Sequence, residues 1–238
     1  MNKLVLMLMV CLALVGTAQA ERILMDFGAP GEGGVPTTSP DSNGLYWNNQ
    51  PVDANYMNFS LQQITAPGGV DTANNALPNF AVWTYNCAGS GGTGVVDSTL
   101  YPSTAQQDFI FMDGSYNNGL ANALLVAIVG LPSSNYDVKL FGSRITPGAG
   151  RVGTYLVNGQ TQTLDAYANT SNTITFANVP VGDVTIGGVV EHNAILLTCY
   201  VTGTNYGYLS VADLNAVPEP ATMGLLILGA LAALRRRR

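Results

Sequence analysis

Short apolar runs separated by clusters of turn residues make up the middle of this chain. The runs recur at roughly 8 to 15 residue spacing, as in sandwiches and barrels. None of them shows the 3.6-residue period of an amphipathic helix. Residues 136–140 alternate apolar and polar side chains, which is typical of a strand with one buried face. The pattern therefore predicts an all-β domain, built as a β-sandwich or a barrel.

The clearest hairpin signal is the Asn158-Gly159 pair, which lies between the β-prone runs 154–157 and 160–164. Asn and Gly both tolerate positive φ, so this pair predicts a tight two-residue turn. We expect loops over 28–44 and 89–94. Further strands are predicted over 23–27, 57–64, 81–85, 108–112, 123–129, 173–176, 183–190, 194–201 and 206–214.

Residues 1–20 have the pattern of a signal peptide. Lys3 precedes an unbroken apolar run, and Ala18-Gln19-Ala20 closes it with the small-x-small form that signal peptidase requires. We expect cleavage after Ala20, with Ala18 and Ala20 in the peptidase pocket. The alternative is an N-terminal membrane anchor, for which the run is short.

The last residues combine a Pro-Glu-Pro motif, an apolar helix and a basic cluster. Residues 223–234 are apolar, and at about 1.5 Å per residue they reach ~18 Å against a hydrocarbon core of ~30 Å. The basic cluster marks the end that stays in the cytoplasm. The motif consists of Val217, Pro218, Glu219 and Pro220, and the cluster of Arg235, Arg236, Arg237 and Arg238.

This arrangement over residues 217–238 resembles the PEP-CTERM sorting signal of Gram-negative bacteria. The resemblance implies recognition by an exosortase and cleavage near the Pro-Glu-Pro motif. It also implies transient residence in the inner membrane, then delivery to the cell surface or extracellular matrix. The alternative is an ordinary tail anchor.

The order of segments in the middle of the chain carries a second resemblance. The order of strands and turns in residues 23–28, 44–48, 136–144, 155–159 and 206–214 resembles the jelly-roll modules called galactose-binding-like or malectin-like. This resemblance implies a single jelly-roll-like β-sandwich over residues 21–215, often with sugar binding at loops on one edge. The expected chain thus has a signal helix, a sandwich domain and a hydrophobic C-terminal helix.

Charge excludes one class of partner. Residues 21–217 hold four basic and fourteen acidic residues, a formal charge of −10, although the whole chain carries −6. Because such a surface repels phosphate backbones, we expect no nucleic-acid partner.

Catalytic signals are weak. His192 is the only histidine, and no Gly-x-Ser-x-Gly elbow accompanies it, so we interpret it as a turn residue. A single histidine also excludes the usual multi-histidine zinc sites. Residues 89–94 match Gly-x-Gly-x-x-Gly, but no helical pattern follows, so they are interpreted as a loop. We therefore predict no catalytic residues.

Two features leave alternatives open. Cys87 and Cys199 form a disulfide after export, or they are buried free thiols. Residues 113–119 offer oxygen ligands for a structural Ca²⁺ but lack the order of a calcium loop, and a plain turn is the alternative. We expect no other metal and no cofactor.

Candidate sugar contacts are Trp47, Trp83 and Arg144, since carbohydrate recognition needs aromatic faces and planar hydrogen-bonding groups. The alternatives are core packing for the tryptophans and structural ion pairs for Arg144 and Arg151. Our hypothesis is an exported envelope or matrix protein with a non-catalytic structural or carbohydrate-contact role, whose partner is an extracellular polysaccharide. The alternative is a secreted polysaccharide or ester hydrolase, which a pocket holding two carboxylates ~5–10 Å apart would favour.

Overall fold

The computed structural model describes residues 21–28, 34–52, 61–64, 68–94, 99–114, 123–146, 150–201, 203 and 205–218. In these ranges strands dominate, and one short helix is present, α2 (Ser103–Gln107). The all-β prediction is therefore confirmed. No helix in the described ranges is long and apolar enough to cross a membrane. The predicted signal peptide and the apolar helix over 223–234 lie outside these ranges.

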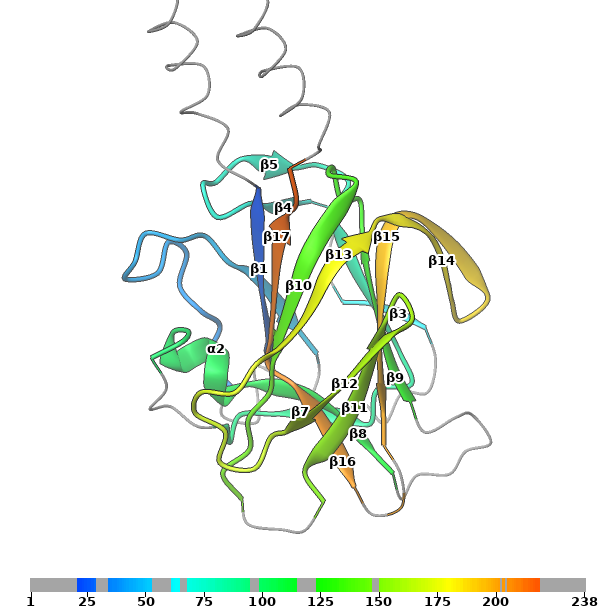
Figure 1. Cartoon of the computed structure of the whole chain (residues 1–238). Helices are drawn as coiled ribbons and strands as arrows, with labels where there is room; N and C mark the ends of the chain where they lie inside the picture. Colours follow the sequence, from blue (N-terminus) through cyan, green and yellow to red (C-terminus); the bar gives the residue numbers. More distant parts are fainter. Residues whose placement is uncertain are drawn as a thin grey trace, which may run out of the picture.

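Two large sheets form the body of the domain (Figure 1). The first has the order β13 (Ile174–Pro180), β10 (Asn135–Phe141), β17 (Val211–Ala216), β1 (Arg22–Gly28) and β2 (Asn48–Pro51). Its pairs are antiparallel except for β1 and β2, which run parallel.

The second sheet has the order β12 (Gln160–Asp165), β11 (Val152–Val157), β15 (Val189–Tyr200), β9 (Ala123–Val129), β6 (Ala81–Tyr85) and β3 (Gln62–Gln63). Strand β14 (Gly182–Ile186) also pairs with β15 but is not part of this strand order. A third sheet has the order β16 (Tyr206–Leu209), β8 (Phe109–Asp113) and β7 (Gly89–Gly91), and β4 (Gly69–Val70) pairs with β5 (Ala76–Leu77).

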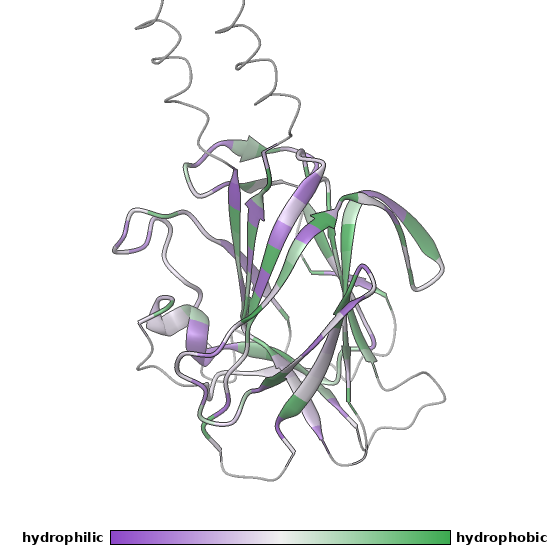
Figure 2. Cartoon of the chain, viewed as in Figure 1, coloured by the Kyte–Doolittle hydropathy of each residue, from purple (hydrophilic) through white to green (hydrophobic). Residues whose placement is uncertain are grey.

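The two large sheets share one core. Alternate residues of β1, such as Met25 and Phe27, meet alternate residues of β9, such as Leu124 and Val126, in a single buried cluster. Figure 2 shows hydrophobic residues concentrated on β9 and β15 and a more hydrophilic β12 at the edge of its sheet. Two sheets facing each other across a core fit the predicted sandwich, whereas its jelly-roll connectivity stays a prediction.

Turn chemistry explains where the predicted strands are right and wrong. Asn158 and Gly159 have φ of 45° and 76°, and they join β11 to β12 as expected. The predicted strand 183–190 is instead a hairpin, because Gly187 and Gly188 adopt φ of 56° and 85° between β14 and β15. The predicted strand 206–214 breaks at Ser210, so that β16 and β17 join different sheets.

Candidate functional site

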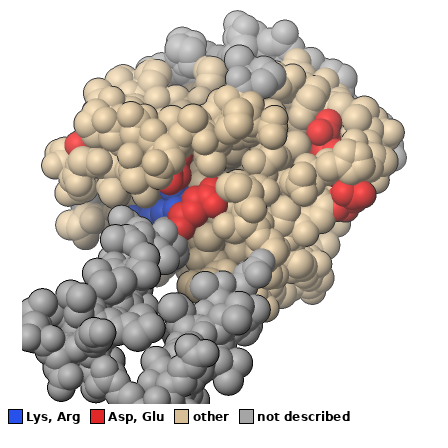
Figure 3. Space-filling view, turned by 90° about the horizontal axis from the view of Figure 1, so that it is seen from above, with Lys and Arg blue, Asp and Glu red and all other residues tan. Residues whose placement is uncertain are grey.

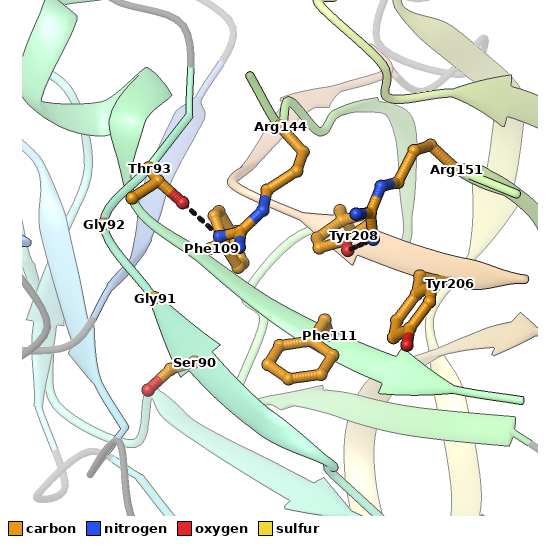
Figure 4. Close-up of a pocket in the computed structure, with 10 residues that line it drawn as sticks. All are labelled: Ser90, Gly91, Gly92, Thr93, Phe109, Phe111, Arg144, Arg151, Tyr206 and Tyr208. Atoms are coloured by element: carbon orange, nitrogen blue, oxygen red, sulfur yellow. Dashed lines mark hydrogen bonds between the residues drawn. The ribbon is translucent and has the colours of Figure 1, made fainter. Parts of the chain in front are cut away.

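A cleft of about 330 Å³ lies over the sheet made by β16, β8 and β7 (Figure 4). Two arginines and four aromatic rings dominate it, and we call it the arginine–aromatic cleft. Its lining residues are Ser90, Gly91, Gly92, Thr93, Phe109, Phe111, Arg144, Arg151, Tyr206 and Tyr208.

Strand alternation gives this small sheet its two different faces. In the pairing register, Tyr208 lies opposite Phe111, and Gly91 lies opposite Phe109, so the three aromatic side chains share one face and Gly91 leaves space beside them. The intervening Ile110, Met112 and Leu209 point the other way, into the main core. The period of two thus directs one set of residues to the core and leaves an aromatic face for the cleft.

A glycine keeps the cleft open on the β7 side. A methyl group at Gly91 would lie 2.9 Å from Cζ of Phe109 and 3.6 Å from Nη1 of Arg144. The glycine-rich segment 89–94 was predicted to be a loop, but its first three residues are strand β7. Hydrogen bonding to β8 therefore aligns the backbone of β7 along the aromatic face.

The four rings form a continuous contact network. Phe109 meets Tyr208 edge to face at 5.0 Å between ring centroids, and Tyr208 stacks on Phe111 at 5.9 Å. Tyr206 extends the stack, 6.2 Å from Tyr208. Phe109 and Tyr208 are buried, whereas Phe111 and Tyr206 are only partly buried. The outer two rings therefore keep part of their surface accessible.

Both arginines lie close to the ends of the connection between β10 and β11, and their backbones are fixed. The Arg144 amide donates to the Ala166 carbonyl at 2.8 Å, and the Ala166 amide donates to the Arg151 carbonyl at 3.0 Å. The guanidinium carbon of Arg144 lies 5.0 Å from the Phe109 ring centroid, and that of Arg151 lies 4.7 Å from the Tyr206 centroid. Both cations thus rest on aromatic faces.

Neither arginine has an acidic partner among the described residues, where the ion pairs are Arg22–Asp213 and His192–Asp183. Arg144 donates to the Thr93 hydroxyl and Arg151 to the Tyr208 hydroxyl. The Nε atom of each is buried without a hydrogen-bond partner. Burial, together with the neighbouring charge of Arg151, lowers the pKa of Arg144. The alternative of structural ion pairs is therefore not seen here.

The face seen from above in Figure 3 differs from this cleft. Charged side chains are sparse there, and basic surface lies directly beside acidic surface. None of the described residues that line the cleft is acidic. The cleft is therefore a local concentration of positive charge in a domain of net negative charge.

The structure separates the three predicted sugar contacts. Arg144 lines the cleft. Trp47 is 4% exposed and donates from Nε1 to Oδ2 of Asp41 at 2.9 Å, which leaves no open ring face for a sugar. Trp83 is partly buried on β6, packed against the cluster that the β14 hairpin covers, and it does not line the cleft.

Sequence reasoning missed the four aromatic residues of the cleft. The available signal was the spacing of two between Phe109 and Phe111 and between Tyr206 and Tyr208. In a strand this spacing places both rings of a pair on one face. Both pairs lie in runs that were predicted as strands.

The other candidate residues lie elsewhere. His192 is a strand residue of β15 instead of a turn residue, and its exposed Nδ1 lies 2.8 Å from Asp183 Oδ1. Asp183 raises the pKa of His192. Cys87 and Cys199 are buried free thiols, so the structure holds the thiol alternative and not the disulfide. Of the proposed calcium loop, only Asp113 and Gly114 are described.

Comparison with protein families gives one result. Residues 216–238 match the PEP-CTERM protein-sorting motif. This match confirms the tail prediction over 217–238, and the motif implies export, exosortase-dependent sorting and a cell-surface or extracellular location. No curated protein matches the chain.

Proposed function

We propose that this chain is a non-catalytic protein of the bacterial surface or extracellular matrix that binds acidic saccharides in its arginine–aromatic cleft. The observation that carries this proposal is the pair Arg144 and Arg151, two cations that lie on aromatic rings and have no acidic partner among the described residues. The sorting motif supports it, because an exported protein meets extracellular polysaccharide.

The chemistry of the cleft fits this ligand class. Arginine forks form paired hydrogen bonds with carboxylates, which occur on the uronic acids of many polysaccharides. Aromatic faces pack against the C–H groups of a sugar ring, and Phe111 and Tyr206 keep accessible surface for this contact. A saccharide carboxylate would supply the acidic partner that both guanidinium groups lack among the described residues.

A hydrolase is the weaker reading. Retaining and inverting glycosidases need two carboxylates beside the scissile bond, and no described lining residue of the cleft is acidic. Two carboxylates do line a different cavity, Asp26 and Asp108, but each is 1% exposed. Side chains so deeply buried are poorly placed to reach a glycosidic bond.

A glycan array with purified full-length protein tests the binding proposal. We expect signals on uronic-acid polysaccharides and little signal on neutral ones. The variant R144A/R151A should lose these signals, whereas Lys139→Ala, which removes a cation from β10, should retain them. Binding to neutral glycans alone, or equal binding by R144A/R151A, would contradict the proposal.

The sorting of the chain by an exosortase has a separate test. A tagged chain is followed in an exosortase-positive host and in the same host without the exosortase. We expect processing near Val217–Pro220 and surface delivery to stop in the second strain, with full-length protein accumulating in the inner membrane. Equal processing in both strains would show an ordinary anchor.

A further inference from the structure

A second cavity, of about 160 Å³, lies at the end of β1, and we call it the acid cavity. Asp26 enters it from the face of β1 opposite to the core residues Met25 and Phe27. Asp108, which follows α2 directly, also lines it. The lining residues are Asp26, Gly28, Pro36, Asn49, Gln50, Pro51 and Asp108.

Each carboxylate of the acid cavity has one oxygen without a partner. Asp26 Oδ2 accepts the Thr37 amide at 2.9 Å, whereas Asp26 Oδ1 is buried and unpaired. The Asp108 carboxylate accepts a backbone hydrogen bond from Val35, and its Oδ1 is likewise buried and unpaired. Both residues are 1% exposed, so bulk solvent does not reach either carboxylate.

Asn49 supplies a third unpaired oxygen on the same side. Parallel pairing places Asn49 directly beside Asp26, with both side chains on one face of the sheet. Its Nδ2 donates to the Thr37 carbonyl at 2.9 Å, so the free atom is Oδ1, which is buried without a partner. Gln50 also lines the cavity and has an unpaired oxygen, but it pairs with the core residue Phe27, so strand alternation places its side chain on the opposite face of β2 from Asn49.

The two carboxylates are held close to the backbone of β1, and no basic side chain of the described residues forms an ion pair with them. A methyl group at Gly28 would lie 2.4 Å from Oδ2 of Asp108. The described ion pairs involve neither carboxylate. The pair is therefore electrostatically uncompensated.

We propose that the acid cavity binds a divalent cation, Ca²⁺, through oxygens of Asp26, Asn49 and Asp108. Carboxylate and amide oxygens are the ligands that Ca²⁺ takes, and water or backbone oxygens complete its six to eight contacts. Mg²⁺ is less suited, because it requires near-ideal octahedral geometry and gives up its water reluctantly. The ion would tie β1, β2 and the segment after α2 together.

Thermal melting and calorimetry of full-length protein in mild detergent test this proposal, with Ca²⁺ alone as the probe. After EDTA treatment, 1 mM Ca²⁺ should raise the melting temperature by about 5 °C or more. Calorimetry should show one site per chain. The variant D26N/D108N should lose both responses, while the exposed-site control Asp183→Asn should keep them.

A failure of the variant to fold can be told apart from a loss of Ca²⁺ binding, because the stability of D26N/D108N in EDTA also has an expected direction of change. Removing two uncompensated buried charges should leave D26N/D108N at least as stable as wild type in EDTA. No heat and no melting shift with Ca²⁺ would overturn the proposal. If D26N/D108N gave the full Ca²⁺ response, the ion would not bind in the acid cavity. If wild-type protein responded equally to Mg²⁺, the assignment of the ion as Ca²⁺ would be wrong.

Discussion

The arginine–aromatic cleft and the acid cavity differ in the kind of polar atom that they leave without a hydrogen-bond partner. In the cleft the unpaired atoms are hydrogen-bond donors, the Nε atoms of Arg144 and Arg151. In the cavity they are acceptors, oxygens of Asp26, Asn49 and Asp108. Because a buried unpaired polar group costs free energy, each set indicates the kind of ligand that would remove that cost.

The two regions also differ in how open they are. The cleft is about twice the volume of the cavity, and its outer rings and arginines are only partly buried. Both carboxylates of the cavity are almost completely buried. An extended saccharide suits the first environment, and a single ion suits the second. The following predictions test this contrast, beginning with the largest expected effect.

Gly28→Ala should disrupt the acid cavity most strongly. The new methyl group would overlap with Asp108, 2.4 Å from Oδ2 and 2.5 Å from Cβ, so the carboxylate must move. Overpacking of this kind costs about 1–3 kcal/mol. We expect a lower melting temperature and no Ca²⁺ response. Gly182→Ala, whose methyl group meets nothing within 4 Å, is the matched control and should keep the response.

The variant R144Q/R151Q should abolish the proposed function of the cleft without unfolding the domain. Hydrogen bonds to charged groups contribute about 1.5–3 kcal/mol each, so losing both should weaken acidic-saccharide binding at least about 100-fold. Circular dichroism should still show the wild-type β spectrum, and Ca²⁺ should still raise the melting temperature. A loss of Ca²⁺ binding in this variant would show that the two regions are not independent.

Gly91→Ala should narrow the cleft and leave its charge unchanged. The methyl group would press on the tip of the Phe109 ring at 2.9 Å, so the ring must shift by a few tenths of an ångström. We expect saccharide affinity to fall by a factor of about 3–10. Titrating this variant and the wild type with the same saccharide measures how much the shape of the cleft, apart from its charge, contributes to affinity. Unchanged affinity would show that the ligand does not contact β7.

His192→Ala should have the smallest effect. The His192–Asp183 pair is exposed, with side chains 70% and 67% accessible, and such pairs contribute little. We expect unchanged melting, saccharide binding and Ca²⁺ response. If an ester or glycoside substrate is hydrolysed and the variant loses that activity with its fold intact, the non-catalytic proposal fails.

Local patterns in the sequence predicted much of the fold. Alternation identified β10, and Asn158-Gly159 identified the β11–β12 hairpin with its positive φ angles. The hairpin at Gly187-Gly188 was missed although a Gly-Gly pair is a local hairpin signal, because apolar residues continue on both sides of it. The break at Ser210 has no such signal, since it depends on which sheet each half of the apolar run joins, and that information is not local.

The sites were harder to predict than the strands. Arg144 was predicted as a candidate sugar contact, but the aromatic residues of its cleft come from β8 and β16, which are distant in sequence and meet only through sheet pairing. No sequence motif surrounds Asp26 or Asp108 that would have indicated a site. They meet because β1 ends beside the segment that follows α2.

The central claim is that the arginine–aromatic cleft recognises the charge of a saccharide. Calorimetric titration of full-length protein with an oligogalacturonate and with its methyl ester tests this most directly, because the two ligands share their rings and differ in the carboxylate. We predict that the free acid binds at least about 10-fold more tightly and that R144Q/R151Q removes the difference. Equal affinity for acid and ester, or an undiminished preference in the variant, would contradict the account.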